Sequence, residues 1–348
     1  MDFTGRRQSG PVAVFGATGH TGRFVVAELV RRGMGVIAMA RDGAALEAAG
    51  FSGQGMVKRQ ASVEDAASLR GALAGAAVVI NCAGPFLETA DAVADAAVSL
   101  GVHYLDLSAE QASTMATLER YGDAAREAGV AVIPSVGFYG GFADLLATVA
   151  MGEWDGAESI DVMIGLDSWH PTRGTRITGE RNTAQRMVVE GGRLAPLKMP
   201  RAERPWRFGE PLGEQRLVEV PFSEMVLIAR HLRAKGIHTY LSSVALEDLH
   251  RAETPAPRSA DASGRSAQRF VVEVLVGRDG EQRRVTARGR DIYAFSAPLV
   301  CEVAQRVMDG RICRAGAGAL GELLDAREVL AALTPEFLSM EMEAAVAS

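Results

Sequence analysis

The stretch that decides the fold runs from Val12 to Gly22 and reads Val-Ala-Val-Phe-Gly-Ala-Thr-Gly-His-Thr-Gly. Its first four residues are apolar, as in a buried strand of a parallel sheet. Three glycines follow at the spacing G-x-x-G-x-x-G. Residues 21–32 then place apolar side chains at helical intervals and stop at Gly33. The stretch therefore predicts a strand, a glycine-rich turn and a helix.

The same alternation continues along the chain. We expect strands at 36–40, 55–59, 77–81, 103–106 and 130–133, with helices at 44–49, 63–73, 89–100 and 112–128 between them. Such alternation requires a parallel sheet with crossover helices. The predicted fold class is α/β: a Rossmann-type doubly wound parallel sheet with a second α+β domain that contains a mostly antiparallel sheet.

The regular alternation of strands and helices ends after residue 140. We expect strands at 159–166 and 237–242, helices at 183–190 and 223–235, and a surface loop over 251–268. Segments 270–276 and 283–288 alternate around Asp279-Gly280, a hairpin signal. Helices are expected at 298–308 and 320–333. The predicted domains are 1–145 for the dinucleotide, 146–296 for substrate or dimerisation, and 297–348 as a helical segment packing back on the first domain.

Composition narrows the class of protein. The chain has 348 residues, 48% of them hydrophobic and 23% charged, which predicts a folded globular protein of about two domains. A net charge of −6 without a basic run argues against nucleic-acid binding. The sequence shows no long apolar span, signal-peptide pattern or metal-type cysteine spacing, so we predict no membrane span, a cytoplasmic location and no metal.

The glycine-rich turn predicts a nucleotide site. Gly16 permits a tight turn, Gly19 allows close approach of a pyrophosphate, and Gly22 lets the helix pack on the strand. Free N–H groups at the helix start would face the diphosphate. The alternative is a purely structural turn, and the side chain of His20 either contacts the cofactor or points outward. The predicted cofactor contacts in this turn are Gly16, Thr18, Gly19, His20, Thr21 and Gly22.

The end of the second strand favours NADP(H) over NAD(H). NAD binding expects an acidic residue there, whereas this chain has Arg41 followed by Asp42. A guanidinium matches the 2′-phosphate of NADP. The alternative is that Arg41 is solvated and Asp42 binds the ribose.

Residues 81–86, Asn-Cys-Ala-Gly-Pro-Phe, follow the fourth strand. Ligands of doubly wound sheets lie at this end of the strands, and a Gly-Pro turn presents backbone to the nicotinamide. Cys82 could be a nucleophile, but no base is indicated beside it, so a buried small residue is the better interpretation. The predicted cofactor contacts here are Asn81, Ala83, Gly84, Pro85 and Phe86.

These motifs together resemble the saccharopine dehydrogenase-like NADP-binding oxidoreductase family, which includes trans-acting enoyl reductase-like proteins. Residues 16–22 and 81–86 match it, and residues 101–110 resemble its G-x-x-Y-x-D-x-[ST]-G-E motif with Ala109 in place of glycine. Gly137-Phe138 and Asp144-Leu145 resemble its G-F-D-S-x-P-S-D-L motif, with different residues between them. The resemblance implies the fold and the cofactor, but it does not specify the substrate.

Two segments supply candidates for substrate contact. Asp106 and Glu110 follow the fifth strand, and both could orient a ligand. The alternative is that Asp106 caps the next helix and Glu110 is solvated. Residues 167–176 gather a histidine, two arginines, hydroxyls and an aromatic ring. His170 is the candidate catalytic proton donor. The predicted substrate contacts are Asp106, Ser108, Glu110, Phe138, Trp169, Arg173 and Arg176.

The other histidines, at positions 103, 231, 238 and 250, are expected to be structural. We predict an NAD(P)-dependent oxidoreductase that transfers hydride between NADPH and a small-molecule C=N, C=O or activated C=C substrate bound between the two domains. The alternative is a non-catalytic NADP-binding sensor or partner subunit. A homodimer through the second domain is a further possibility.

Overall fold

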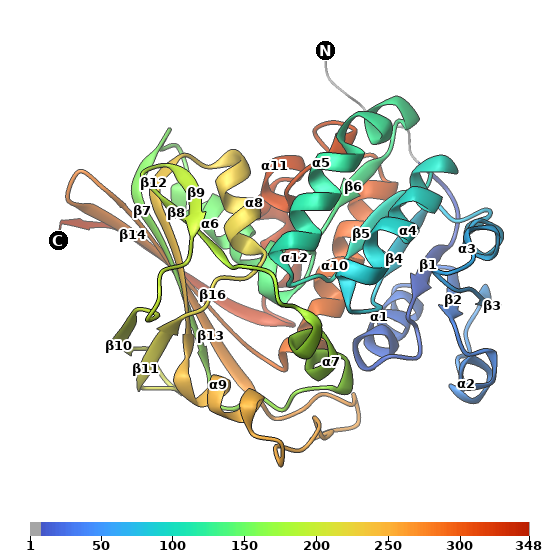
Figure 1. The fold of residues 1–348 in the computed structure, drawn as a ribbon, viewed down its shortest axis with the longest axis horizontal. Helices are drawn as coiled ribbons and strands as arrows, with labels where there is room; N and C mark the ends of the chain where they lie inside the picture. Colours follow the sequence, from blue (N-terminus) through green and yellow to red (C-terminus); the bar gives the residue numbers. More distant parts are fainter. Residues whose placement is uncertain (1–7, 348) are drawn as a thin grey trace. The chain divides into compact units, whose positions relative to one another are not determined.

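The computed structural model describes residues 8–347 and divides into two compact units (Figure 1). Unit 1 contains the chain up to Gly137 together with Ser296–Asp325, and unit 2 contains Phe138–Phe295 together with the chain from Ala326 onward. The first boundary lies eight residues before the predicted one at 145/146, because Phe138 already packs in the aromatic core of unit 2.

Unit 1 is built on a parallel sheet of seven strands in the order β15-β6-β5-β4-β1-β2-β3. All six predicted strands are present, and β15 adds a seventh by pairing parallel to β6. The predicted fold class is therefore confirmed. The strands are β1 (Val12–Phe15), β2 (Val36–Ala40), β3 (Met56–Gln60), β4 (Val78–Asn81), β5 (His103–Asp106), β6 (Ala131–Ile133) and β15 (Gly316–Ala317).

The crossover helices of unit 1 run in two directions from β1. Since β2 and β3 lie on one side of β1 and β4 to β6 on the other, right-handed crossovers place α1 and α4 on opposite faces. Asp65 caps α3, and Gly129 closes α5 at φ +70°. The helices are α1 (His20–Arg31), α2 (Gly43–Ala48), α3 (Ala66–Leu73), α4 (Phe86–Ser99), α5 (Gln111–Ala128), α10 (Ile292–Met308) and α11 (Leu320–Leu323).

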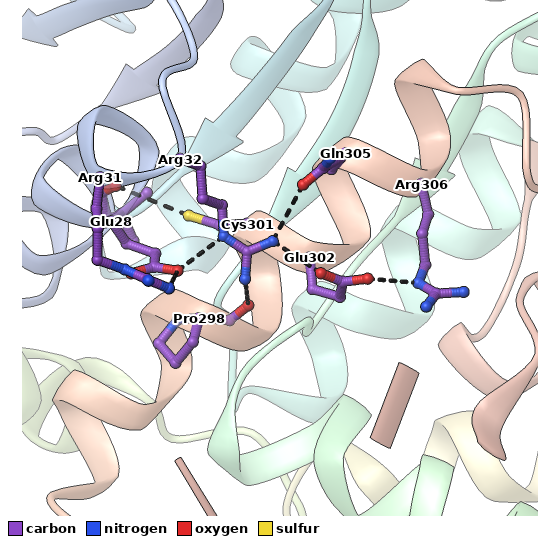
Figure 2. A network of polar contacts seen from close by, with 9 residues as sticks. Glu28, Arg31, Arg32, Pro298, Cys301, Glu302, Gln305 and Arg306 are labelled. Carbon is purple, nitrogen blue, oxygen red and sulfur yellow. Dashed lines mark hydrogen bonds and ion pairs between the residues drawn. The ribbon is translucent and has the colours of Figure 1, made fainter. Parts of the chain in front are cut away.

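A network of charged side chains joins α10 to α1 (Figure 2). The Arg32 guanidinium donates to both Glu28 and Glu302 at 2.7 Å, and Arg306 donates to Glu302 at 2.7 Å. Burial alone would raise the pKa of Glu302, but the hydrogen bonds from Arg32 and Arg306 lower it below its ordinary value. This network fixes a late segment of the chain to the first helix of the nucleotide-binding fold.

Unit 2 contains a mixed, mostly antiparallel sheet in the order β10-β11-β12-β7-β13-β14-β16, with β8 paired to β12 and β9 to β8. The predicted hairpin is confirmed as β13 and β14, with Asp279 and Gly280 both at positive φ. The strands are β7 (Ala157–Leu166), β8 (Met187–Glu190), β9 (Arg193–Pro196), β10 (Glu203–Arg207), β11 (Glu214–Glu219), β12 (Ala234–Ser242), β13 (Arg269–Arg278), β14 (Glu281–Arg290) and β16 (Leu338–Ala347).

Helices α6, α8 and α12 pack together in unit 2, with α6 on β13 and β14 and α8 on β12. Phe138, Phe142, Phe270 and Phe295 form the aromatic core beside them. The helical segments of this unit are η1 (Phe138–Phe142), α6 (Ala143–Met151), α7 (Arg173–Arg181), α8 (Glu224–His231), α9 (Ser243–His250) and α12 (Ala326–Leu333).

Two sequence predictions for the second half are wrong. Residues 183–190 do not form a helix: Val188 and Val189 are buried in β8, which turns at Gly191-Gly192 into β9. The tail after 297 is neither wholly helical nor confined to unit 1. Residues from Ala326 belong to unit 2, where β16 pairs with β14 and its residues 338–343 alternate apolar and polar side chains.

Candidate functional site

The glycine-rich turn connects β1 to α1 in a conformation that demands glycine at two positions. Gly16 has φ +81°, and a Cβ on it would lie 2.9 Å from the Ala83 backbone. A Cβ on Gly22 would lie 2.2 Å from the Gly16 carbonyl oxygen. The amides of Gly16 and Ala17 both donate to the Met39 carbonyl at 3.0 Å. The turn is thereby held between the ends of β2 and β4.

This position is the topological switch point of the sheet, because β1 lies between β2 and β4 while α1 and α4 leave in opposite directions. The N-cap residue of α1 is Gly19, which has no side chain with which to cap the helix. Backbone amides at such a helix start attract phosphate. The turn, the missing cap and the close approach of Gly16 to Ala83 fit a dinucleotide.

Arg41 and Asp42 differ in what their side chains do. Arg41 is exposed just after β2, and within residues 8–347 its one hydrogen bond is made by its backbone carbonyl, which accepts from the Gln60 side-chain amide at 3.0 Å. The Asp42 carboxylate accepts a hydrogen bond from Ala45 N at 3.0 Å and caps α2. The arrangement leaves the Arg41 guanidinium, rather than the Asp42 carboxylate, available for a ligand.

The loop after β4 is shaped by Asn81. Its side chain is fully buried, accepting from Ala83 N at 3.0 Å and donating to Thr89 and Tyr104. Asn81 therefore holds the loop that presents Ala83 and Gly84-Pro85 beside the glycine turn. Cys82 is half-buried rather than buried as predicted, and desolvation raises the pKa of its thiol far above the ordinary value, which argues against a reactive nucleophile.

Asp106 and Ser108 are fully buried and bonded within the protein. Asp106 accepts from Ser108 N at 2.9 Å, Ser135 N at 2.7 Å and the Tyr104 hydroxyl at 2.9 Å. Ser108 Oγ in turn accepts from Glu110 N at 3.1 Å. These side chains tie the ends of β5 and β6 together, so they build the edge of the sheet on which a ligand would lie.

Glu110 is also buried, which contradicts the solvated alternative considered for it. Its carboxylate accepts from Phe86 N at 2.7 Å and reaches Leu87 N at 3.5 Å. Those two amides begin α4, where Pro85 offers no side-chain cap. Glu110 therefore caps α4 from a distant part of the sequence, and burial raises its pKa.

In unit 2, the segment after β7 places its predicted residues differently. Trp169 is buried, with its indole N–H donating to the Tyr293 hydroxyl at 2.9 Å. Arg176 donates to the carbonyls of Leu249, Arg251 and Thr254, so it connects the segment after β7 to residues 249–254. Arg173 is exposed at the start of α7, and His170 is half-buried.

Phe138 is 4% exposed and packs edge-on against Phe270 with ring centroids 4.8 Å apart. The structure therefore uses it as core, contrary to the prediction of a substrate contact. The polar partners of three histidines fit the structural roles expected: His103 accepts from Ala131 N at 2.8 Å, His231 lies 2.7 Å from Asp144, and His238 lies 2.7 Å from Glu219.

Sequence reasoning missed a cluster of buried polar groups in unit 2. The hydroxyl of Tyr139 and one carboxylate oxygen of Glu224 are buried without a hydrogen-bond partner among the described residues, as is Nε of Arg201. The Tyr139 ring stacks 4.3 Å from Phe222, which Arg186 covers at 5.1 Å. The only local signal was the apolar, helix-forming surroundings of Glu224, which leave a carboxylate on a buried face.

Comparisons with known proteins agree with this fold. Residues 12–133 match the family model of the saccharopine dehydrogenase NADP binding domain. A relative from Arabidopsis thaliana, described as a probable mitochondrial saccharopine dehydrogenase-like oxidoreductase, is 25% identical over 219 residues, which are 56% of this chain and 46% of the relative. The chain thus spans less than half the length of that relative.

Among solved structures, apo saccharopine dehydrogenase (L-Glu forming) from Saccharomyces cerevisiae aligns with a TM-score of 0.65 and 14% identity, over 97% of this chain and 100% of that one. This likeness shows a shared fold. The predicted resemblance to the saccharopine dehydrogenase-like family is confirmed, with the family model covering the nucleotide-binding fold. Within residues 8–347, no helix is long and apolar enough to cross a bilayer.

Proposed function

We propose that the chain is an NADP(H)-dependent oxidoreductase that transfers hydride between the nicotinamide and a C=N, C=O or activated C=C bond of a small molecule. One observation carries the proposal. The glycine turn, sterically restricted at Gly16 and Gly22, lies against Ala83 at the switch point of a sheet whose residues match an NADP-binding domain. When bound, the nicotinamide supplies or accepts the hydride.

Within the proposed site, the backbone of residues 16–22 holds the diphosphate and Arg41 pairs with the 2′-phosphate. The loop that Asn81 shapes orients the nicotinamide side through Ala83, Gly84-Pro85 and Phe86. His170 donates the proton that accompanies hydride transfer, and Arg173 contacts the substrate, while the buried Trp169 positions this segment through its hydrogen bond to Tyr293. The homodimer through the second domain and the cytoplasmic location stay predictions.

A non-catalytic NADP-binding sensor or partner subunit is the second candidate. The observation that favours it is the complete internal use of the acidic side chains after β5: Asp106 and Glu110 are buried and bonded to backbone amides. Neither is placed to exchange a proton with a substrate. His170 thus decides between the two candidates.

The cofactor assignment is tested at Arg41. NADPH and NADH are titrated while nucleotide fluorescence is followed, for the native chain and for Arg41→Asp. Loss of a charge-assisted bidentate pair and gain of a repulsive charge should weaken NADPH by about tenfold or more. NADH should change little. Arg70→Asp, which alters another exposed arginine of unit 1, is the matched control. Equal losses for both nucleotides would refute the 2′-phosphate assignment.

The proton-donor assignment is tested at His170. Loss of a general acid typically lowers turnover by about 10²-fold or more. We expect His170→Ala to show this loss in NADPH oxidation with a panel of carbonyl and imine substrates, with NADPH affinity unchanged. An unchanged turnover would remove His170 from the mechanism. Saturable NADPH binding without turnover by the native chain on any substrate would favour the sensor.

A further inference from the structure

Unit 2 contains a pocket of about 710 Å³ where α7, the loop after it, the connection from β9 to β10 and the end of α9 meet. Three of its lining residues are arginines: Arg176, Arg186 and Arg201. The one carboxylate in the lining, Glu180, is exposed. The lining therefore carries more positive than negative charge, with three guanidinium groups against one carboxylate.

The three arginines are not equivalent. Arg176 is used by the protein, since it donates to one backbone carbonyl at the end of α9 and to two in the segment that follows α9, the shortest at 2.8 Å. It builds the wall of the pocket. The charge left for a ligand belongs to the other two arginines, which reach the pocket from separate segments of the chain.

Arg186 and Arg201 are partly buried, and within residues 8–347 neither forms an ion pair. Arg186 lies over the Phe222 ring and gives one hydrogen bond to Pro221 O at 2.6 Å. Nε of Arg201 is buried with no hydrogen-bond partner in that range. Burying a charged donor without a partner is costly, and a second positive charge beside it adds repulsion. Burial lowers the pKa of Arg186 and the charge of Arg201 lowers it further, while the charge of the buried Glu224 carboxylate raises it and offsets part of this effect.

The rest of the lining is partly apolar. Met199 is 74% exposed, and Leu197 and Leu249 line the same pocket. A large exposed apolar side chain next to two guanidinium groups that form no ion pair within residues 8–347 suits a ligand with two chemically different ends. One end is an oxyanion, which guanidinium groups bind in a bidentate manner.

We propose that this pocket binds a small organic anion through Arg186 and Arg201, with the apolar part of the ligand against Leu197 and Met199. The oxyanion is a carboxylate or a phosphate monoester. The site does not depend on the proposed nucleotide site, because every residue in it belongs to unit 2. Arg173 and Arg176, which the sequence favoured for substrate contact, are not its anion ligands.

The test is calorimetric titration of the full chain with three probes of similar apolar size: hexanoate, hexyl phosphate and uncharged hexanol. Both anions should bind saturably, and the tighter one identifies the oxyanion. Arg201→Met and Arg186→Met keep the apolar stem and remove the charge, so each should weaken anion binding by about tenfold or more. Arg193→Met, at an exposed arginine of β9 outside the pocket, should bind as the native chain does.

Folding is checked by thermal unfolding of each variant. Because Arg186 also stacks on Phe222, Arg186→Lys serves as a second variant that keeps charge and loses the bidentate geometry. Failure of both anions to bind, hexanol binding as tightly as the anions, or Arg201→Met and Arg186→Met binding like the native chain would each overturn the proposal. NADPH titration in the same samples separates this result from the proposed function, since loss of the pocket should leave NADPH affinity unchanged.

Discussion

The carboxyl edge of the unit 1 sheet and the pocket of unit 2 handle polar groups in opposite ways. At the sheet edge, Asn81, Asp106 and Glu110 are buried and bonded, and their hydrogen bonds leave backbone and glycines as the surface offered to a ligand. In unit 2, Arg201 and Glu224 have buried polar atoms without hydrogen-bond partners among the described residues. The first region therefore presents a rigid backbone surface, whereas the second keeps buried polar atoms that have no hydrogen-bond partner within residues 8–347.

The largest effect on stability and on NADPH binding is expected at Gly22, where the backbone leaves no room for a side chain. The added Cβ of Gly22→Ala would meet the Gly16 carbonyl at 2.2 Å, so the turn or α1 must move. We expect a loss of about 3 kcal/mol in the free energy of unfolding, with loss of NADPH binding. Denaturant unfolding and NADPH titration measure both.

The matched control is Gly71→Ala in α3, where nothing lies within 4 Å of the new Cβ. It should stabilise the chain by about 0.5–1 kcal/mol. If Gly22→Ala behaved like Gly71→Ala, the tight packing of the glycine turn would be refuted.

The next effect is expected at Glu110. Glu110→Ala leaves the first amides of α4 without their acceptor, which should cost about 2 kcal/mol. Glu110→Gln keeps an acceptor oxygen and should recover part of the loss. Glu127→Ala, at an exposed position near the end of α5, should change stability by less than about 0.5 kcal/mol. A cost no larger than that of Glu127→Ala would show that Glu110 does not cap α4.

A smaller effect is expected at Glu302, in the network between α1 and α10 (Figure 2). Glu302→Gln should cost about 1 kcal/mol at neutral pH. Because the folded-state pKa of Glu302 is lowered, its contribution is complete above the unfolded-state pKa and is lost as pH falls through the folded-state pKa.

The difference between the native chain and Glu302→Gln should therefore shrink in acid, as followed by chemical unfolding at several pH values. Glu64→Gln, an exposed change of the same kind, should show little difference at any pH. A difference for Glu302→Gln that stayed constant down to strongly acidic pH would contradict an ionised, network-bound Glu302.

The smallest effect is expected for Glu224→Gln in unit 2. Near pH 5 this substitution should change the free energy of unfolding least, and at higher pH it should stabilise the chain. Burial raises the pKa of this carboxyl, and one of its oxygens has no partner in the described chain. The folded state therefore binds more protons than the unfolded state as pH rises above the ordinary value of 4.5, and stability falls. Glu224→Gln removes this penalty, so its relative stability should increase with pH. A pH-independent difference would refute a Glu224 carboxyl whose pKa is raised by burial.

The contrast between the two regions also explains what the sequence could predict. The glycine turn is local: its three glycines, the strand before it and the helix after it are consecutive, and backbone sterics alone restrict them. Residues 12–133 could therefore be assigned to strands and helices in the right order. Arg41 and Cys82 could be interpreted from their places at strand ends.

Features built from distant segments could not be predicted. Glu110 reaches the start of α4 across 24 residues, and no spacing rule indicates that bond. Arg186 lies in a segment predicted from the sequence to be a helix, and Arg201 lies in one with no predicted element. The pocket also needs residues of α9, which are distant in the sequence from both arginines. The hairpin of β8 and β9 does have a local signal, because Gly191-Gly192 both adopt positive φ at its turn.

The central claim is that the glycine turn of unit 1 holds NADP(H), and a fluorescence titration of the native chain and of Gly22→Ala with NADPH and NADH tests it most directly. The account predicts saturable binding of NADPH to the native chain, about tenfold or more tighter than NADH, and loss of that binding in the variant. Absence of saturable binding by either nucleotide, or unchanged NADPH affinity in Gly22→Ala, would contradict it.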